Sequence, residues 1–222
     1  MRKLVAVVAL ALVAVAGCTA GPGDAEEVAP PDTITRYPST EPPVPPSVVA
    51  RENGATVAAA LPTDAEVTGF TRPAAPPPTT LKLCPTAPRE VPPTLVHSAG
   101  FWSAGPRSLA VVAVLDDKAP ADQLLATLSP QDCPAEDKDG NEYVYDRQPY
   151  ESPDGWTGTL NTSLKTGPAG DKSYESIYLL SKGEALVNVV AGGPVGPAVS
   201  FDPAIDETAA HYLQLVLDRF AA

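Results

Sequence analysis

The stretch SYESIYLLSKGEALVNVVA, residues 173–191, decides the fold class. Its two halves, residues 173–181 and 185–191, are rich in the β-branched and aromatic residues that strands favour. The short Lys182-Gly183 connection between them predicts a hairpin. Because short turns between successive strands favour antiparallel pairing, this stretch predicts an antiparallel sheet.

Further strands are predicted on the N-terminal side of this hairpin. The run LAVVAVL, residues 109–115, is apolar on both faces and therefore predicts a central strand. Turn signals such as Asp154-Gly155 separate the other candidate strands. Besides the hairpin and the central run, we expect strands over residues 95–102, 142–148 and 156–164.

A long helix is predicted at the C-terminus, where Asp202 is a good N-cap and Pro203 a good first residue. The apolar residues after them recur at helical spacing, at Ile205, Ala209, Tyr212, Leu213, Val216, Leu217 and Phe220. Two shorter helices are expected, one near Asp64 from the capping-box pattern Thr63-x-x-Glu66, and one over residues 119–128. The sequence thus predicts an α+β domain, with helices on one side of a mainly antiparallel sheet of about six strands.

The N-terminus carries the pattern of an export signal. Arg2 and Lys3 precede a continuous apolar run over residues 4–15, which is short for a membrane-spanning helix but suits a signal peptide. The small residues before Cys18 resemble the lipobox of bacterial lipoproteins. This resemblance implies cleavage after residues 1–17 and a lipid anchor, palmitate among its acyl chains, on Cys18. The alternative interpretation is an ordinary secretory signal with a chance cysteine at the cleavage site.

Residues 18–50 are predicted to form a lipidated tether, and residues 51–222 the folded domain. Prolines recur in the tether at positions 22, 30, 31, 38, 42, 43, 45 and 46. Such a chain is stiff and extended, so it can hold the domain away from the membrane. The net charge of −12 and the pI near 4.5 disfavour binding to nucleic acid and to anionic lipid headgroups. The Cys18 lipid is therefore expected to anchor the protein on the extracytoplasmic face of the cell membrane.

Two cysteines, Cys84 and Cys133, remain when Cys18 is assigned to the lipid. An even pair in an exported chain predicts one disulfide bond. The alternative is a redox or metal-binding pair. That alternative lacks a C-x-x-C motif and a histidine near either cysteine in the sequence.

Motifs for catalysis or for cofactors are missing. The two histidines, His97 and His211, lie in no catalytic pattern, and His97 and Ser98 point to opposite faces of their predicted strand. Asp137, Asp139 and Asn141 alternate like the start of a calcium-binding loop, but an EF-hand needs Gly and Glu where the chain has Glu142 and Gln148. We therefore expect no enzyme activity, no catalytic residue, no metal and no cofactor.

Two segments leave functional alternatives open. The Gly/Pro-rich residues 191–197 connect the last strand to the last helix, and a lid over a cleft is the alternative. Aromatic residues at Tyr143, Tyr145, Tyr174, Tyr178 and Trp156 form either core packing or a platform for a glycan or an apolar ligand.

Several architectural features recur together from about residue 60 to the C-terminus. They are Leu61-Pro62 before a short helix, Cys84, the strand ending near Trp102, the run 109–115, the helix 119–128, Cys133, Trp156 and the strand 186–190. This layout, with the lipobox and tether, resembles actinobacterial envelope lipoproteins that carry a PknH-like extracellular sensor domain. The resemblance implies a cleft-bearing α+β fold that senses an unidentified ligand. The kinase sensor has two disulfides, whereas here the cysteines allow one.

The function expected from these features is a membrane-anchored, non-catalytic binding or sensor-like lipoprotein of the cell envelope. Its partner is an unknown protein, glycan or lipid ligand. The alternative is a carrier of lipid or glycolipid, since a curved sheet packed by a long helix can enclose an apolar cavity. An envelope hydrolase is disfavoured because nucleophiles and bases are so few.

Overall fold

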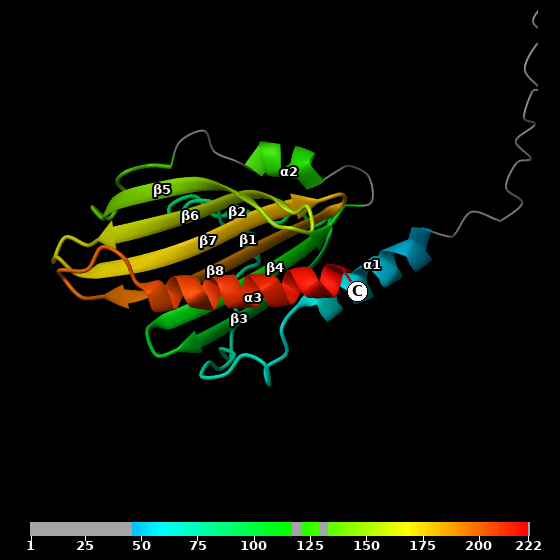
Figure 1. Ribbon diagram of the computed structural model, residues 1–222, viewed down its shortest axis with the longest axis horizontal. Coiled ribbons are helices and arrows are strands. Elements are labelled where there is room, and N and C mark those ends of the chain that lie inside the picture. The colour runs from blue at the N-terminus through cyan, green and yellow to red at the C-terminus, as the bar shows by residue number, and fades with distance from the viewer. Residues whose placement is uncertain (1–45, 117–120, 129–132, 222) are drawn as a thin grey trace, which may run out of the picture. The chain divides into compact units, whose positions relative to one another are not determined.

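The computed structural model describes residues 46–116, 121–128 and 133–221 (Figure 1). The predicted signal peptide, Cys18 and the tether up to residue 45 lie outside the described residues, as does the start of the helix expected from residue 119. The elements follow in the order α1 (Pro46–Ala60), β1 (Thr80–Leu81), β2 (Arg89–Glu90), β3 (Val96–Ala104), β4 (Arg107–Leu115), α2 (Ala121–Leu128), β5 (Glu142–Glu151), β6 (Thr157–Thr166), β7 (Lys172–Lys182), β8 (Ala185–Val195) and α3 (Pro203–Ala221).

The main sheet has six antiparallel strands in the order β3-β4-β8-β7-β6-β5. The predicted hairpin is β7–β8, and its two-residue connection has Gly183 at a positive φ of 57°, which suits a type II′ turn. The apolar run 109–115 lies in β4, between β3 and β8. The α+β class, the six antiparallel strands and the long C-terminal helix are confirmed.

Both faces of the central strands are buried, because these strands carry apolar residues at odd and even positions. Val111 and Ala113 of β4 belong to the core on the first face, which α1 and α3 cover. Val112 and Val114 alternate with them and belong to a second core on the opposite face. Burial on both sides explains why the central strands are continuous apolar runs in the sequence.

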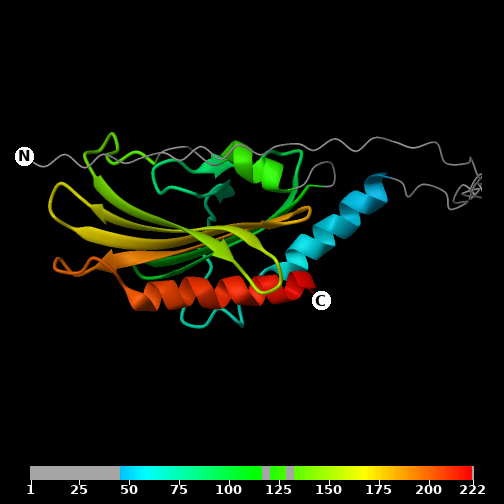
Figure 2. The same ribbon diagram turned by 45° about the horizontal axis from the view of Figure 1, so that its top comes forward.

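The second face is covered by α2 and by the segment that carries β1 and β2. Ala121, Leu124 and Leu125 of α2 pack on this second core, together with Leu81 and Leu83. Figure 2 shows α2 and α3 on opposite sides of the sheet. The expectation that helices lie on one side therefore holds for α1 and α3, whereas α2 packs on the other. Helix α2 lies there because the apolar side chains on the second face of β4 and β8 would otherwise be exposed to water.

Several boundaries differ from those predicted. Helix α1 begins at Pro46, inside the segment assigned to the tether, and was not predicted. Strand β8 continues to Val195, so most of the Gly/Pro segment 191–197 pairs with β7 instead of forming a loop. Near Asp64 a turn replaces the expected helix, although the capping-box glutamate does accept a hydrogen bond from the Thr63 N–H at 2.8 Å.

Candidate functional site

A proline-rich segment, residues 73–93, crosses the second face of the sheet, and we call it the strap. It contains the short strands β1 and β2, which pair with each other and not with the main sheet. Its prolines, at 73, 76, 77, 78, 85, 88, 92 and 93, limit the regular pairing that it can make. The strap is held to the sheet by a buried asparagine, an ion pair and a disulfide bond.

The asparagine is Asn188, in the middle of β8 and 1% exposed. Its Oδ1 accepts a hydrogen bond from the Lys82 backbone N–H at 2.7 Å, and its Nδ2 donates to the Lys82 carbonyl at 3.0 Å. The same Nδ2 donates to the Tyr178 carbonyl at 2.7 Å. Asn188 therefore pairs with the strap backbone as a strand neighbour would, and it satisfies polar groups that would otherwise be buried without partners.

The ion pair joins Lys82 of the strap to Glu175 of β7. Lys82 Nζ lies 2.7 Å from Glu175 Oε1, and each side chain is 23% exposed. Glu175 extends across Gly192 of β8, where a Cβ would lie only 2.9 Å from the glutamate Cγ. The second oxygen, Oε2, is buried and has no hydrogen-bond partner among the described residues. The carboxylate therefore depends on Lys82 for its charge compensation.

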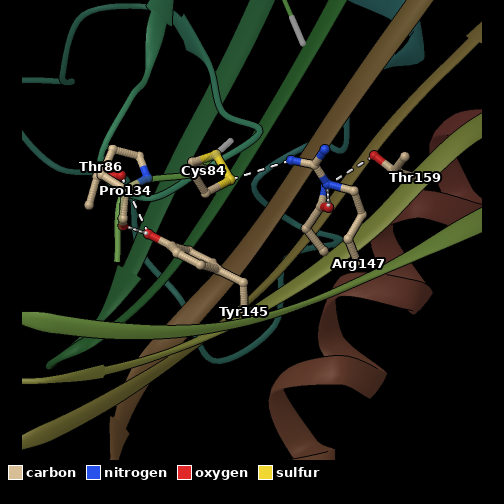
Figure 3. The surroundings of a disulfide bond; sticks show 8 residues. Cys84, Thr86, Pro134, Tyr145, Arg147 and Thr159 are labelled. Atoms are coloured by element: carbon tan, nitrogen blue, oxygen red, sulfur yellow. Dashed lines mark hydrogen bonds between the residues drawn. A yellow bond between two sulfur atoms is a disulfide. The ribbon is translucent and has the colours of Figure 1, made fainter. Parts of the chain in front are cut away.

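The predicted disulfide joins Cys84 of the strap to Cys133, with the Cα atoms 5.7 Å apart. Figure 3 shows Tyr145 and Arg147 of β5 on either side of it. Arg147 Nη2 donates to Cys133 Sγ at 3.4 Å, and the Tyr145 hydroxyl donates to the Pro134 carbonyl at 2.8 Å. The bond thus ties the strap to the segment that enters β5 at the far edge of the sheet.

Between the strap and the sheet lies a cavity of about 390 Å³, which we call the strap cavity. The strap contributes four prolines, together with Thr80 and Lys82. The sheet contributes residues from four strands, namely Phe101, Trp102, Ser103, Ser108, Leu109, Ala110, Glu175, Asn188 and Val190. A concave, mainly apolar lining with a few convergent polar groups is typical of a small-molecule site.

A second cavity, of about 470 Å³, lies between the strap and the edge strand β3. It shares Pro73, Pro77 and Phe101 with the strap cavity and is also lined by Arg72 and His97. The Arg72 guanidinium is engaged elsewhere, because it pairs with Asp64 and lies 4.7 Å from the centre of the Trp102 ring. His97 Nδ1 lies 3.1 Å from the Leu95 carbonyl oxygen. These contacts do not orient Arg72 or His97 toward a nucleophilic side chain.

The two histidines are not brought together. His97 lies on β3, and His211 lies on α3 with its ring 4.9 Å from that of Tyr212. Of the residues that the structure describes, no histidine or cysteine lines the strap cavity. Among the same residues, no group of three or more His, Cys, Asp or Glu side chains is placed to hold a metal ion. In this described part of the chain, no helix is both long and apolar enough to cross a membrane.

The calcium-like segment instead folds around one carboxylate. Asp137 Oδ1 accepts hydrogen bonds from the backbone N–H groups of Asp139 and Asn141, at 2.9 and 3.1 Å. Asp137 Oδ2 accepts hydrogen bonds from Asn141 Nδ2 and the Tyr143 hydroxyl, both at 2.8 Å. The bonds from Asn141 are the main reason why the pKa of Asp137 falls to about 2. The calcium-like segment is therefore a turn that is held by hydrogen bonds to its own Asp137 carboxylate.

This turn predicts a change in the pH dependence of stability. Because folding lowers the pKa of Asp137 from 3.8 to about 2, its contribution is present above pH 3.8 and is lost as the pH falls toward 2. We expect Asp137→Asn to lose less stability than the wild type between pH 5 and pH 2, in urea unfolding monitored by circular dichroism. Asp139→Asn is the control with the same charge change, and its slope should match the wild type. Equal slopes for Asp137→Asn and the wild type would contradict this account.

The aromatic residues do not form one platform. Tyr143 and Tyr145 stack on each other with ring centroids 5.9 Å apart, on the second face. Tyr174, Tyr178 and Trp156 are buried in the core of the first face. Alternation along β7 places Tyr174 on the side of the sheet opposite the strap, so the two aromatic groups are separated by the sheet.

Sequence reasoning found the disulfide of this site but missed Asn188, Lys82 and Glu175. Asn188 is the only polar residue in the apolar run 185–191, which is the signal that could have revealed it. Lys82 and Glu175 are 93 residues apart in the chain, and no local pattern links them. No protein-family model, curated protein sequence or solved structure matches the chain.

Proposed function

We propose that this protein is a non-catalytic, membrane-anchored binding module on the extracytoplasmic face of the cell membrane, with the strap cavity as its ligand site. The observation that carries the proposal is the cavity itself. Its volume of about 390 Å³ lies in the range of small-molecule sites, which is roughly 300–1,000 Å³. The lipobox-like sequence before Cys18 and the proline-rich segment after it support the anchor and the location.

The construction of the cavity supports binding. Its floor is formed by neighbouring strands of an antiparallel sheet, and its roof is a strap rich in proline, which loses little conformational entropy on ordering. Asn188 and the Lys82–Glu175 pair hold the roof to the floor, and the Cys84–Cys133 bond ties the roof to the segment that precedes β5. A site held open in this way avoids much of the ordering cost of binding.

The polar groups of the cavity favour binding over catalysis. Ser103, Ser108 and Thr80 supply hydroxyls, but no histidine among the described residues lines the cavity to act as their base. The carboxylate of Glu175 is held by Lys82. These groups can donate hydrogen bonds to a ligand and accept hydrogen bonds from it, as a recognition site requires.

A lipid carrier has less support. An acyl chain would need apolar room between the sheet and the long helix α3. That region is filled by α3 side chains that are almost fully buried, among them Leu213, Val216 and Leu217. The strap cavity, with its ion pair and hydroxyls, suits a compact polar ligand better than an acyl chain.

The proposal predicts that small molecules shift the amide NMR signals of the strap cavity. Lys82, Ala110 and Val190 line the cavity, whereas Trp156 packs against Phe220 in the core of the first face, with ring centroids 5.5 Å apart. We expect fragments from a small-molecule library to shift the amides of Lys82, Ala110 and Val190 in the full-length chain, in a saturable way. The amides of Trp156 and Phe220 should not move with the same fragments. A library without hits, or hits that shift the amides of Trp156 and Phe220 equally, would overturn the assignment of the site.

A further inference from the structure

The floor of the strap cavity carries two parallel rows of side chains with different chemistry. In the first row, Phe101, Ala110 and Val190 are cross-strand neighbours on β3, β4 and β8. In the next row, Ser103 and Ser108 are neighbours, followed by Gly192 and then Glu175. Rows two residues apart lie on the same face of a sheet. The floor therefore presents an apolar strip beside a strip of hydroxyls that ends at the ion pair.

Gly192 gives the polar row its shape. Since Gly192 has no side chain, Glu175 extends over β8 and meets Lys82 of the strap. The ion pair therefore closes one end of the cavity, and its two charges cancel. Lys82 Nζ uses one of its three donors on Glu175, and within the described ranges no second partner is found for it, so the other donors can serve a ligand.

The ion pair disfavours charged ligands. An anion that drew Lys82 away would leave the Glu175 carboxylate without its counterion. The cost would be high because Oε2 of that carboxylate is already buried without a partner in the described part of the chain. A cation that bound Glu175 would be placed next to the Lys82 ammonium, and like charges at that separation repel. The cavity therefore selects a ligand that leaves the pair intact.

We propose that the strap cavity binds a neutral, polyhydroxylated ring, as found in a monosaccharide or disaccharide unit. Such a ring has a face of C–H groups, which fits the apolar row, and the aromatic face of Phe101 attracts polarised C–H groups. Its hydroxyl rim fits Ser103, Ser108 and the remaining Lys82 donors. This inference rests on the proposed function, because it names the ligand class of the same cavity.

The test uses sugars that share one ring and differ in charge. The full-length chain is purified in a detergent without a sugar headgroup, and its ¹H–¹⁵N NMR spectrum is followed at mildly acidic pH. The probes are N-acetylglucosamine, which is neutral, protonated glucosamine and ionised glucuronic acid. We expect saturable shifts of the amides of Phe101, Ser108 and Lys82 with the neutral sugar, at affinities on the order of millimolar. Both charged sugars should bind at least about tenfold more weakly.

Two variants test the contacts. The double variant Ser103→Ala/Ser108→Ala should weaken binding of N-acetylglucosamine about tenfold, because both hydroxyls lose their ligand hydrogen bonds. Ser173→Ala is the matched control: register places it on the same face as Glu175 in β7, but it does not line the cavity. Its affinity should equal that of the wild type.

Three outcomes would overturn the inference. They are equal or tighter binding of a charged sugar, binding that the serine double variant leaves unchanged, and no shift of cavity amides by any of the sugars. Each is distinguishable from failure of the proposed function. If fragments still shift the cavity amides while sugars do not, the binding site stands and the sugar class is wrong.

Discussion

The double variant Cys84→Ala/Cys133→Ala is expected to lose about 4 kcal/mol of unfolding free energy, as the chain-entropy model predicts for a loop of this size. The two cysteines are 49 residues apart, and Cys84 is fully buried in the strap. Without the bond, the unfolded chain gains the freedom of that loop. The loss should appear in urea unfolding as a lower midpoint.

Reduction of the wild-type protein provides the control for this prediction. A reducing agent removes the same covalent constraint without changing the sequence, so the reduced wild type should unfold at nearly the same urea concentration as the double variant. A destabilisation below about 1 kcal/mol would contradict the account, because a value that small is within the range of ordinary single substitutions. It would mean that other contacts restrain this loop already in the unfolded state.

Asn188→Ala is expected to cost a similar amount, about 4 kcal/mol, from a single side chain. The substitution leaves the N–H and the carbonyl of Lys82 without their partner in a buried region, and it also removes the additional bond to the Tyr178 carbonyl. Each buried polar group without a partner costs about 1–3 kcal/mol. Because two of these three bonds go to the strap, we also expect the Lys82 amide to exchange its hydrogen much faster in the variant.

The matched control is Asn161→Ala, since Asn161 is also buried but bonds to Arg147 and Thr159 instead of to the strap. Both variants should lower overall stability, but only Asn188→Ala should selectively speed hydrogen exchange in residues 80–84. If exchange in the strap rises equally in the two variants, Asn188 is not what holds the strap to the sheet.

The strands and the C-terminal helix were predictable because their signals are local. Alternating and continuous apolar runs, a Gly turn and the Asp202-Pro203 start each fix a local backbone geometry. Helix α3 accordingly begins at Pro203, the residue predicted to start it. Helix α1 was missed because Pro46 and its neighbouring prolines matched a tether, and because Gly54 and the valines of this segment weaken its helical pattern.

The candidate site was far less predictable, because its groups come from distant parts of the chain. The strap contributes Lys82 and Cys84, β7 contributes Glu175, and β8 contributes Asn188. Only the cysteines indicate their pairing through chemistry, because the hypothesis of an exported chain with a lipid on Cys18 leaves two cysteines, which predict one disulfide. The other contacts depend on strand order, which places β8 between β4 and β7, and a single sequence does not specify that order.

The proposed function requires the space between the strap and the sheet to be a ligand site. Ala110 lies on the cavity floor, and Ala99 lies on the same face of β3 and lines the second cavity instead. The most direct measurement is amide NMR of the full-length chain with the library fragments that shift the cavity amides of the wild type. The account predicts that Ala110→Phe, which fills the strap cavity, abolishes their binding and that Ala99→Phe leaves it unchanged. Binding that survives in a folded Ala110→Phe variant would contradict it.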